Sequence, residues 1–195
     1  MSKWDITKEE VVAGGFLKLL HITKTDGNKE RVFSRIGSPD WVQVVMLQPD
    51  LDNEYEKVLM VKQYRHGNDT TTIEFPSGIV DEGEEPLQTA HREMLEETGC
   101  VAKEMIYLGS ACPNPAIMNN QMHTFLALGY DKVAELDLDP DEEIELVEME
   151  LSEVMEGAGD PPFTHSLLFQ SLFLLDRYLG GARYYIESKR WEGVE

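Results

Sequence analysis

The stretch GIVDEGEEPLQTAHREMLEETGC, from Gly78 to Cys100, packs acidic residues together at high density. Pro86 suits the first turn of a helix, because the N–H that proline lacks would be unpaired there anyway. Gly99 suits the residue just past a helix end, where a left-handed conformation is common. We therefore predict a helix that begins at Pro86 and stops before Gly99. Three glutamates fall inside it: Glu93, Glu96 and Glu97.

The three glutamates share one face of this predicted helix, at about 100° per residue. Glu93 and Glu97 lie one turn apart, so their carboxylates point to the same place. Two carboxylates about 6 Å apart repel by roughly 3 kcal/mol at an effective dielectric constant of about 20. A divalent cation would turn that repulsion into a binding site, and carboxylate oxygens suit Mg²⁺ or Mn²⁺; a solvated helix face is the alternative. The roughly opposite, buried arc is predicted to hold Leu87, Ala90, His91, Met94 and Thr98.

The pattern extends into the loop before the helix. Five residues separate Gly78 from Glu84, and seven separate Glu84 from Arg92. The other fixed residues follow directly: Glu93, Glu96, Glu97 and Gly99. This arrangement resembles the signature of the Nudix hydrolases at every fixed Gly, Glu and Arg position. Cys100 stands where the family usually has an aliphatic residue, and a buried cysteine behaves as a small hydrophobe.

The resemblance implies both a fold and a chemistry. The fold is α+β, a Nudix α/β/α sandwich around a mixed sheet. The chemistry is hydrolysis of a nucleoside diphosphate linked to another moiety, with Mg²⁺ as the expected cofactor and Mn²⁺ as the other candidate. Glu96 and Glu97 are implied to act in catalysis, and Glu84 to pair with Arg92. The implied metal ligands are the backbone carbonyl of Ser77 and the carboxylates of Glu84, Glu93, Glu96 and Glu97. The implied structural residues are Gly78, Arg92 and Gly99.

About residues 31–179 are similar to one branch of the family, the ADP-ribose and nucleoside-diphosphate-sugar pyrophosphatases. VKQYRH before IEFPSGIVDEGE carries the likeness. In it Arg65 is the implied phosphate-binding arginine, since its planar fork suits diphosphate oxygens; a surface strand arginine is the alternative. The stretch from Gly78 to Cys100 is the acidic box. Pro115 stands about fifteen residues past it, as in members that act on ADP-ribose. We therefore expect a small nucleotide-sugar substrate, cleaved to a nucleoside monophosphate and a sugar phosphate.

The catalytic base has more than one candidate residue, and so does the contact with the nucleobase. The run DLDPDEEIELVEME is similar to an acidic loop that carries the catalytic base in this branch, so Glu142 or Glu143 is expected there. A purely solvated loop would explain the run almost as well. His123 is the less favoured base, because such histidines more often pack in the core or at its rim. Trp41 and Trp4 are candidates to stack on the nucleobase, although either could simply pack.

Strand patterns fill the first half of the chain, with a hairpin turn at Asp26-Gly27. We predict that residues 1–43 form a small antiparallel sheet and that residues 44–195 form the Nudix domain. The resemblance implies a homodimer in which the N-terminal sheet packs on the partner. A helix over 164–179, apolar on nearly every face, is expected to be buried on more than one side. The predicted strands are 16–25, 30–37, 41–49, 57–65, 70–78, 105–111, 122–130 and 144–151.

The composition limits which binding partners and which cellular compartment we expect. The 195 residues include 17 basic and 37 acidic side chains, for a net charge of −20. Such a surface repels phosphate backbones, so we expect no nucleic-acid partner. Cys100 and Cys112 form neither a disulfide framework nor a zinc spacing. The N-terminus lacks an apolar signal segment, and the run SLLFQSLFLL is too short to cross a bilayer. We expect a cytoplasmic protein with no membrane contact.

Two other functions compete with hydrolysis of a nucleotide sugar. A non-catalytic Nudix-fold sensor of ADP-ribose would usually carry a damaged acidic box, whereas this box is intact. A Nudix hydrolase of another nucleotide would keep the same metal-binding residues. The acidity of the chain argues against RNA as that substrate.

Overall fold

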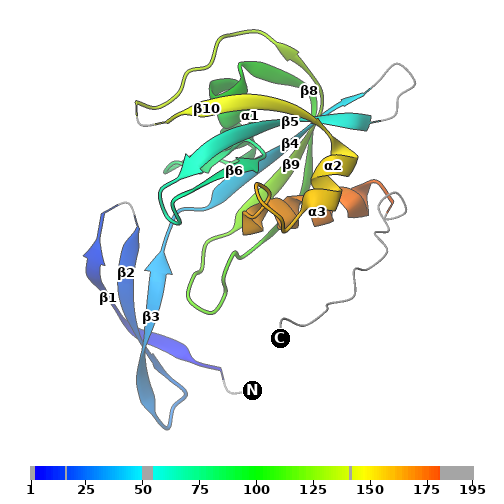
Figure 1. Cartoon of the computed structure of the whole chain (residues 1–195). Coiled ribbons are helices and arrows are strands. Elements are labelled where there is room, and N and C mark those ends of the chain that lie inside the picture. Colours follow the sequence, from blue (N-terminus) through cyan, green and yellow to red (C-terminus); the bar gives the residue numbers. More distant parts are fainter. Residues whose placement is uncertain (1–2, 16, 50–54, 141, 181–195) are drawn as a thin grey trace.

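The computed structural model describes residues 3–15, 17–49, 55–140 and 142–180. Its first strands form a three-stranded antiparallel sheet that lies to one side of the large sheet, with Ile36 bonded to the 112–121 loop (Figure 1). The strands are β1 (Asp5–Gly14), β2 (Lys18–Thr25) and β3 (Glu30–Gly37). Their presence confirms the predicted N-terminal sheet. The first residue of the predicted strand 16–25, Phe16, lies outside the described residues.

The N-terminal sheet has little core of its own. Leu20 and Ile22 are its buried apolar residues among those described. The turn between β2 and β3 is built as expected, because the Asp26 carboxylate accepts hydrogen bonds from the N–H groups of Asn28 and Lys29 at 2.9 and 3.0 Å. A sheet of three short strands with so small a buried face is marginally stable alone.

The second sheet is larger and mixed, as predicted. Five strands lie in the order β10-β5-β4-β9-β8, while β6 pairs with β5 and β7 pairs with β4. The pair β4–β9 is parallel and the other pairs are antiparallel. The strands are β4 (Trp41–Pro49), β5 (Tyr55–Arg65), β6 (Thr70–Glu74), β7 (Ser77–Ile79), β8 (Cys100–Ala111), β9 (Met122–Lys132) and β10 (Ile144–Glu150).

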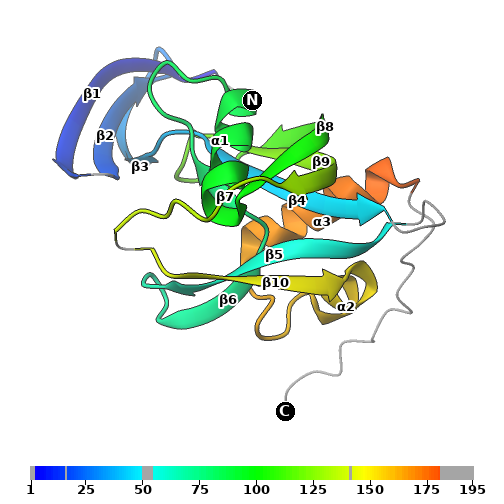
Figure 2. The ribbon, with the colours of Figure 1, turned by 90° about the horizontal axis from the view of Figure 1, so that it is seen from above.

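Helices cover both faces of this sheet, which confirms the α/β/α sandwich. Helix α1 (Pro86–Thr98) packs on one face, over a cluster that includes Val44, Met46 and Met94. Helices α2 (Leu151–Gly157) and α3 (Ser166–Tyr178) cover the other face. The view from above shows the three layers, with the N-terminal sheet to one side (Figure 2). The metal-binding carboxylates predicted on α1 therefore sit above a rigid sheet.

Two elements were not predicted from the sequence, and one predicted strand is two strands in the structure. Strand β1 is exposed along its whole length, so it lacks the alternation that burial of one face would produce. Helix α2 follows β10 directly and is only seven residues long. The predicted strand 70–78 is two strands, β6 and β7, interrupted at Phe75 and Pro76. A proline cannot donate a hydrogen bond to a neighbouring strand, which favours a break there.

The predicted burial of the 164–179 helix is seen on one side within the single chain. Leu168, Leu172 and Leu175 of α3 pack into the core. Phe169 and Phe173 face away from it and are 39% and 66% exposed. The helix covers one face of the sheet, and no described element packs on its outer surface. Within the described ranges, no helix has both the length and the hydrophobicity needed to cross a membrane.

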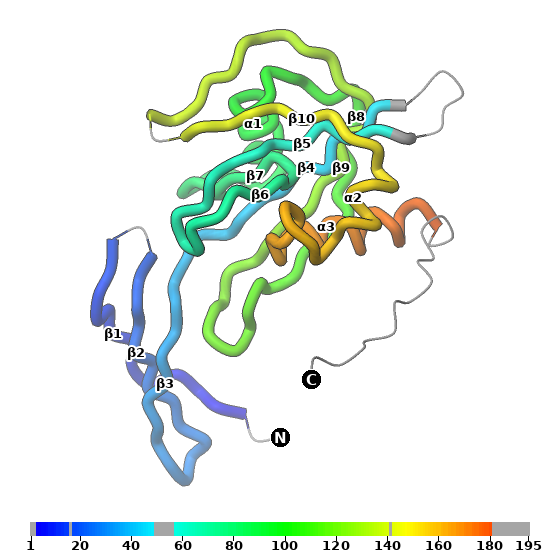
Figure 3. The backbone as a smooth tube through the Cα atoms, in the orientation of Figure 1, coloured from blue at the N-terminus to red at the C-terminus, as the bar shows by residue number. Residues whose placement is uncertain are grey.

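The chain changes from one sheet to the other between Gly37 and Trp41 (Figure 3). Residues 41–43, which we assigned to the N-terminal region, pair with β7 and β9 of the large sheet. The division of the chain into two domains stays a prediction, and residues 181–195 of the second lie outside the described residues.

Candidate active site

Helix α1 begins and ends at the predicted residues. The side chain of Gln88 accepts a hydrogen bond from the N–H of Glu85 at 2.9 Å, which satisfies a group at the helix start. Gly99 adopts a left-handed conformation with φ of 70°. A Cβ atom at Gly99 would lie 2.1 Å from the carbonyl oxygen of Ala134, so no larger side chain fits.

The buried face of α1 differs from the predicted arc. Leu87 is 46% exposed and His91 is also exposed, whereas Glu97 is 3% exposed. The short strand β7 lies beside the helix and shields its glutamate side, where the N–H of Ser77 donates to Oε2 of Glu97 at 2.9 Å. The observed buried residues are Thr89, Ala90, Met94, Glu97 and Thr98.

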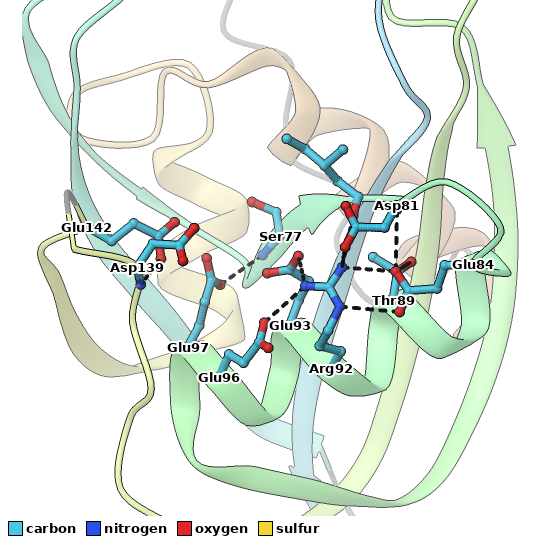
Figure 4. Close-up of polar contacts among 11 residues, drawn as sticks. Ser77, Asp81, Glu84, Thr89, Arg92, Glu93, Glu96, Glu97, Asp139 and Glu142 are labelled. Atoms are coloured by element: carbon cyan, nitrogen blue, oxygen red, sulfur yellow. Dashed lines mark hydrogen bonds and ion pairs between the residues drawn. The ribbon is translucent and has the colours of Figure 1, made fainter. Parts of the chain in front are cut away.

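Arg92 joins the acidic residues of the box (Figure 4). Its guanidinium donates to both carboxylate oxygens of Glu84, at 3.2 and 3.0 Å. A further nitrogen donates to Glu93 at 2.6 Å and to Glu96 at 3.0 Å. Nη2, one of the two nitrogens that bond Glu84, also donates to the backbone carbonyl of Ile79 at 3.0 Å, which ties the loop before α1 to the helix. The implied Glu84–Arg92 pair is thus present.

Gly78 is required by the close approach of the helix. A Cβ atom there would lie 1.9 Å from the carboxyl carbon of Glu93. Any side chain would displace Glu93 or move β7 away from α1. The glycine at the start of the signature therefore places a backbone segment directly against an acidic side chain.

Two carboxylates of the box are incompletely neutralised. Burial raises the pKa of Glu93 to about 7, repulsion from Glu96 and Glu142 adds to this, and Arg92 opposes it. Burial also raises the pKa of Glu97 well above its usual value, and Glu93 and Glu142 contribute. The hydrogen bond from Ser77 works in the other direction. An added cation would relieve both the burial penalty and the repulsion.

The donor set suits a hard divalent cation, although the side chains are not yet gathered around one. Within the described residues, no three Asp, Glu, His or Cys side chains form a ready metal cluster. Arg92 holds Glu93 and Glu96, and Ser77 holds Glu97. Carboxylate oxygens are the ligands that Mg²⁺ and Mn²⁺ prefer, so the chemistry of these side chains fits such an ion.

The acidic loop between β9 and β10 returns to the carboxylates of α1. The N–H of Asp137 donates to the carbonyl of Glu96 at 2.9 Å, which fastens the loop to the end of α1. Figure 4 shows Glu142 and Asp139 beside Glu97. Glu142 is half-buried, whereas Glu143 is exposed. Asp139 was not among the predicted residues, because nothing local distinguishes it from the other acids of this run.

Arg65 makes a contact that the sequence analysis missed. Its Nε and Nη2 donate to the two oxygens of Glu74 at 2.9 and 2.7 Å. Nδ1 of His165 lies 2.8 Å from the same carboxylate, and the hydroxyl of Thr72 also donates to it. Burial would raise the pKa of Glu74, but these bonds outweigh it and hold the pKa at about 2. The only sign of this contact in the sequence was a charged residue, Glu74, between apolar residues in the run IEFPSG.

A family model described as the NUDIX domain matches residues 39–167. The chain belongs to this family. Residues 39–167 contain the acidic box, Arg65, the loop between β9 and β10 and His165, so the geometry above lies within the NUDIX domain. Nudix hydrolases generally use divalent metal cations.

Several proteins are similar to this NUDIX-domain chain. An ADP-ribose pyrophosphatase of Bacillus subtilis (strain 168) is 37% identical over 101 residues, which are 51% of this chain and 55% of that protein. A methanol dehydrogenase activator of Bacillus methanolicus is 36% identical over the same length and share. The chain thus spans about half the length of these two relatives. The ADP compounds hydrolase NudE of Escherichia coli (strain K12) is 28% identical over 152 residues, 77% of this chain and 78% of that protein.

A solved structure extends the likeness to the whole fold. The crystal structure of an ADP compounds hydrolase superposes with a TM-score of 0.75, over 92% of this chain and 95% of that one. Its sequence identity is 23%, so this likeness shows the fold alone.

The remaining predicted residues lie elsewhere in the NUDIX domain and beside it. Pro115 lines a cavity of about 160 Å³ together with Phe33 and Arg35. Trp41 is half-buried at the start of β4. His123 lies between Tyr107, at 3.3 Å, and Asp40, at 3.4 Å.

Trp4 packs edge-on against Phe33, with the ring centroids 5.8 Å apart. Its ring is therefore already engaged within the N-terminal sheet. Phe33 is the aromatic ring that the structure places beside Pro115, and the sequence analysis did not single it out.

Proposed function

We propose that the chain hydrolyses the pyrophosphate bond of ADP-ribose or a related nucleoside diphosphate sugar, with a divalent cation. The products are a nucleoside monophosphate and a sugar phosphate. The observation that carries the proposal is the pair of under-neutralised carboxylates Glu93 and Glu97, with Glu96 on the same helix and Glu142 beside Glu97. The names of the relatives, an ADP-ribose pyrophosphatase and an ADP compounds hydrolase, favour this substrate class.

In the proposed mechanism, Mg²⁺ is the cofactor and Mn²⁺ an alternative. A bound cation supplies charge neutralisation for the diphosphate and lowers the pKa of water. Glu93 and Glu97 would hold it, with Glu84, Glu96 and the Ser77 carbonyl as further candidate ligands. Glu96 or Glu97 orients the attacking water.

The acidic loop and β5 supply the other groups of the proposed mechanism. Glu142 accepts the proton from water, a role that its position beside Glu97 supports over that of exposed Glu143. Arg65, whose Nε and Nη2 pair with Glu74, presents its remaining guanidinium edge to a phosphate oxygen.

The nucleobase is proposed to lie in the cavity lined by Pro115, Phe33 and Arg35. An aromatic ring, a proline and a guanidinium suit the flat face of a base. Trp41 is the second candidate. The cavity is lined by the N-terminal sheet and the 112–121 loop, so a base bound there would lie at the boundary of the two sheets.

We propose a homodimer formed through the N-terminal sheet. Residues 1–37 hold seven basic and five acidic residues, whereas the rest of the chain holds ten and 32. A second copy would thus bring a mildly basic sheet against a strongly acidic domain. The sheet also exposes apolar side chains: Ile6, Val11, Val12, Val32 and Phe33. Light scattering at micromolar concentration would give twice the chain mass, and a monomer would contradict the proposal.

A cytoplasmic location, without nucleic-acid or membrane partners, belongs to the same proposal. Cys100 and Cys112 are both free thiols, as expected in a reducing compartment.

The test of function is a product analysis with purified protein. ADP-ribose, ADP-glucose and GDP-mannose are incubated with Mg²⁺ or Mn²⁺ in ¹⁸O-labelled water, with Glu97→Gln as the inactive control. A nucleoside monophosphate and a sugar phosphate should form, with one label on a single product. Faster release of pyrophosphate from deoxynucleoside triphosphates would overturn the substrate class. Tight ADP-ribose binding without turnover would favour the sensor instead.

A further inference from the structure

Arg65 is held by a single buried carboxylate. Glu74 is completely buried, and it receives two hydrogen bonds from the Arg65 guanidinium, at 2.9 and 2.7 Å. His165, at the residue before α3, lies 2.8 Å from the same carboxylate and is 31% exposed. The hydroxyl of Thr72 donates to it as well. Three segments of the chain thus meet at one negative charge.

This group lies next to the proposed metal-binding residues. Strand β10 begins with Ile144 paired to Gln63, so the chain before β10 continues toward Arg65, and Glu142 is two residues from Ile144. Glu74 is three residues before Ser77, whose N–H bonds to Glu97. The pKa of Arg65 is raised despite its burial, mainly by Glu74 but also by Glu97 and Glu142.

A free guanidinium at this place would compete with a metal ion. Arg92 shows the effect within the same site, because it already binds Glu93 and Glu96. A second arginine on Glu97 and Glu142 would neutralise the remaining carboxylates. The pairing with Glu74 offers Arg65 a nearby alternative, and a bidentate pair to a buried carboxylate is a strong one.

We propose that Glu74, assisted by His165, is a positioning residue that holds the Arg65 guanidinium away from Glu97 and Glu142, so that their negative charge stays available to a divalent cation. The inference rests on the proposed function, because it takes these two carboxylates as part of the metal site. It assigns to Glu74 and His165 a role in metal affinity that neither would have as a simple fold contact.

The test measures Mn²⁺ binding without substrate, by the electron paramagnetic resonance signal of free Mn²⁺. Glu74→Gln should weaken binding at least tenfold. The double variant Glu74→Gln/Arg65→Gln should return to within about threefold of the wild type, since the competing cation is gone. Lys62→Gln is the matched control, because Lys62 lies on the same strand in an exposed pair with Glu145. It should leave binding unchanged.

A second pair of variants covers the case in which Glu74→Gln does not fold. His165→Gln should weaken Mn²⁺ binding about threefold, and adding Arg65→Gln should reverse this. Unchanged binding in the foldable single variant would overturn the proposal. The proposal would also be overturned if Mn²⁺ binding is weakened and removal of Arg65 does not restore it. The contact of Glu74 with Arg65 and His165 would then be merely structural. If Glu97→Gln binds Mn²⁺ as tightly as the wild type does, that result would refute the proposed function instead.

Discussion

Glu74 and Glu97 are buried glutamates of one site, and they respond to burial in opposite ways. Glu74 is 0% exposed and Glu97 is 3% exposed. The pKa of Glu74 is held at about 2, while that of Glu97 is raised well above its usual value. Burial raises the pKa in both cases, so burial cannot account for the difference.

The partners account for it. Glu74 has a bidentate arginine and a histidine beside it. Glu97 has one backbone N–H from Ser77, and its neighbours Glu93 and Glu142 are acidic. A buried charge without a counter-charge is unfavourable, and functional sites are where such groups collect. Glu74 is thus stabilised as a charged group, whereas Glu97 keeps the unneutralised charge that our proposal assigns to a cation.

The largest expected effect is the loss of activity in Glu97→Gln. The turnover number should fall about a thousandfold or more, roughly 4 kcal/mol of barrier, because a ligand charge is lost. Steady-state kinetics with Mg²⁺ and ADP-ribose measure it. Near-normal turnover in a folded variant would remove Glu97 from the metal site.

The next effect is on stability, and it concerns Glu74. Glu74→Gln should lower the free energy of unfolding by about 3 kcal/mol, because it breaks a buried ion pair and leaves Arg65 without its counter-charge. Urea denaturation measures this loss. Lys62→Gln, which breaks an exposed pair, should change the stability by less than about 1 kcal/mol. Equal losses in the two variants would show that burial adds nothing to the Arg65 pair.

The stabilisation by Glu74 should depend on pH in a defined window. Its folded pKa of about 2 lies below the usual 4.5, so the stabilisation is complete above pH 4.5 and is lost as the pH falls toward 2. The full difference between wild type and Glu74→Gln, about 3 kcal/mol, should shrink by about half by pH 3. Denaturation curves at pH 6, 4.5 and 3 would show it. A difference that stays constant over this range would mean that Glu74 is not an ionised partner.

The smallest expected effect is a gain of stability in metal-free Glu97→Gln. Because its folded pKa is raised, ionised Glu97 destabilises the fold at neutral pH and above, and the penalty disappears below about pH 4.5. The variant should melt a few degrees higher at pH 8, for about 1 kcal/mol. Mn²⁺ should stabilise the wild type more than the variant and so reverse the order. A variant that melts lower at pH 8 without metal would contradict the unpaired state of Glu97.

Features defined by neighbouring residues were predictable. Pro86 and Gly99 begin and end α1 as expected, because helix termini depend on local backbone chemistry. The spacing of Gly78, Glu84 and Arg92 predicted the site for the same reason, since one loop and one helix carry it. Burial was less predictable: Leu87 was assigned to the core but is exposed, and Glu97 was assigned to the outer face but is buried beside β7.

By itself the sequence determined the NUDIX family pattern, the mixed sheet between helices and the acidic residues of α1. These follow from periodicity and spacing within short segments. Only the tertiary structure decided that Arg65 binds Glu74 and that His165 reaches the same carboxylate from 91 residues away. It also brought Glu142 beside Glu97. Such contacts depend on how strands and loops are brought together, and the pKa of a buried glutamate follows from those partners and not from its neighbours in the chain.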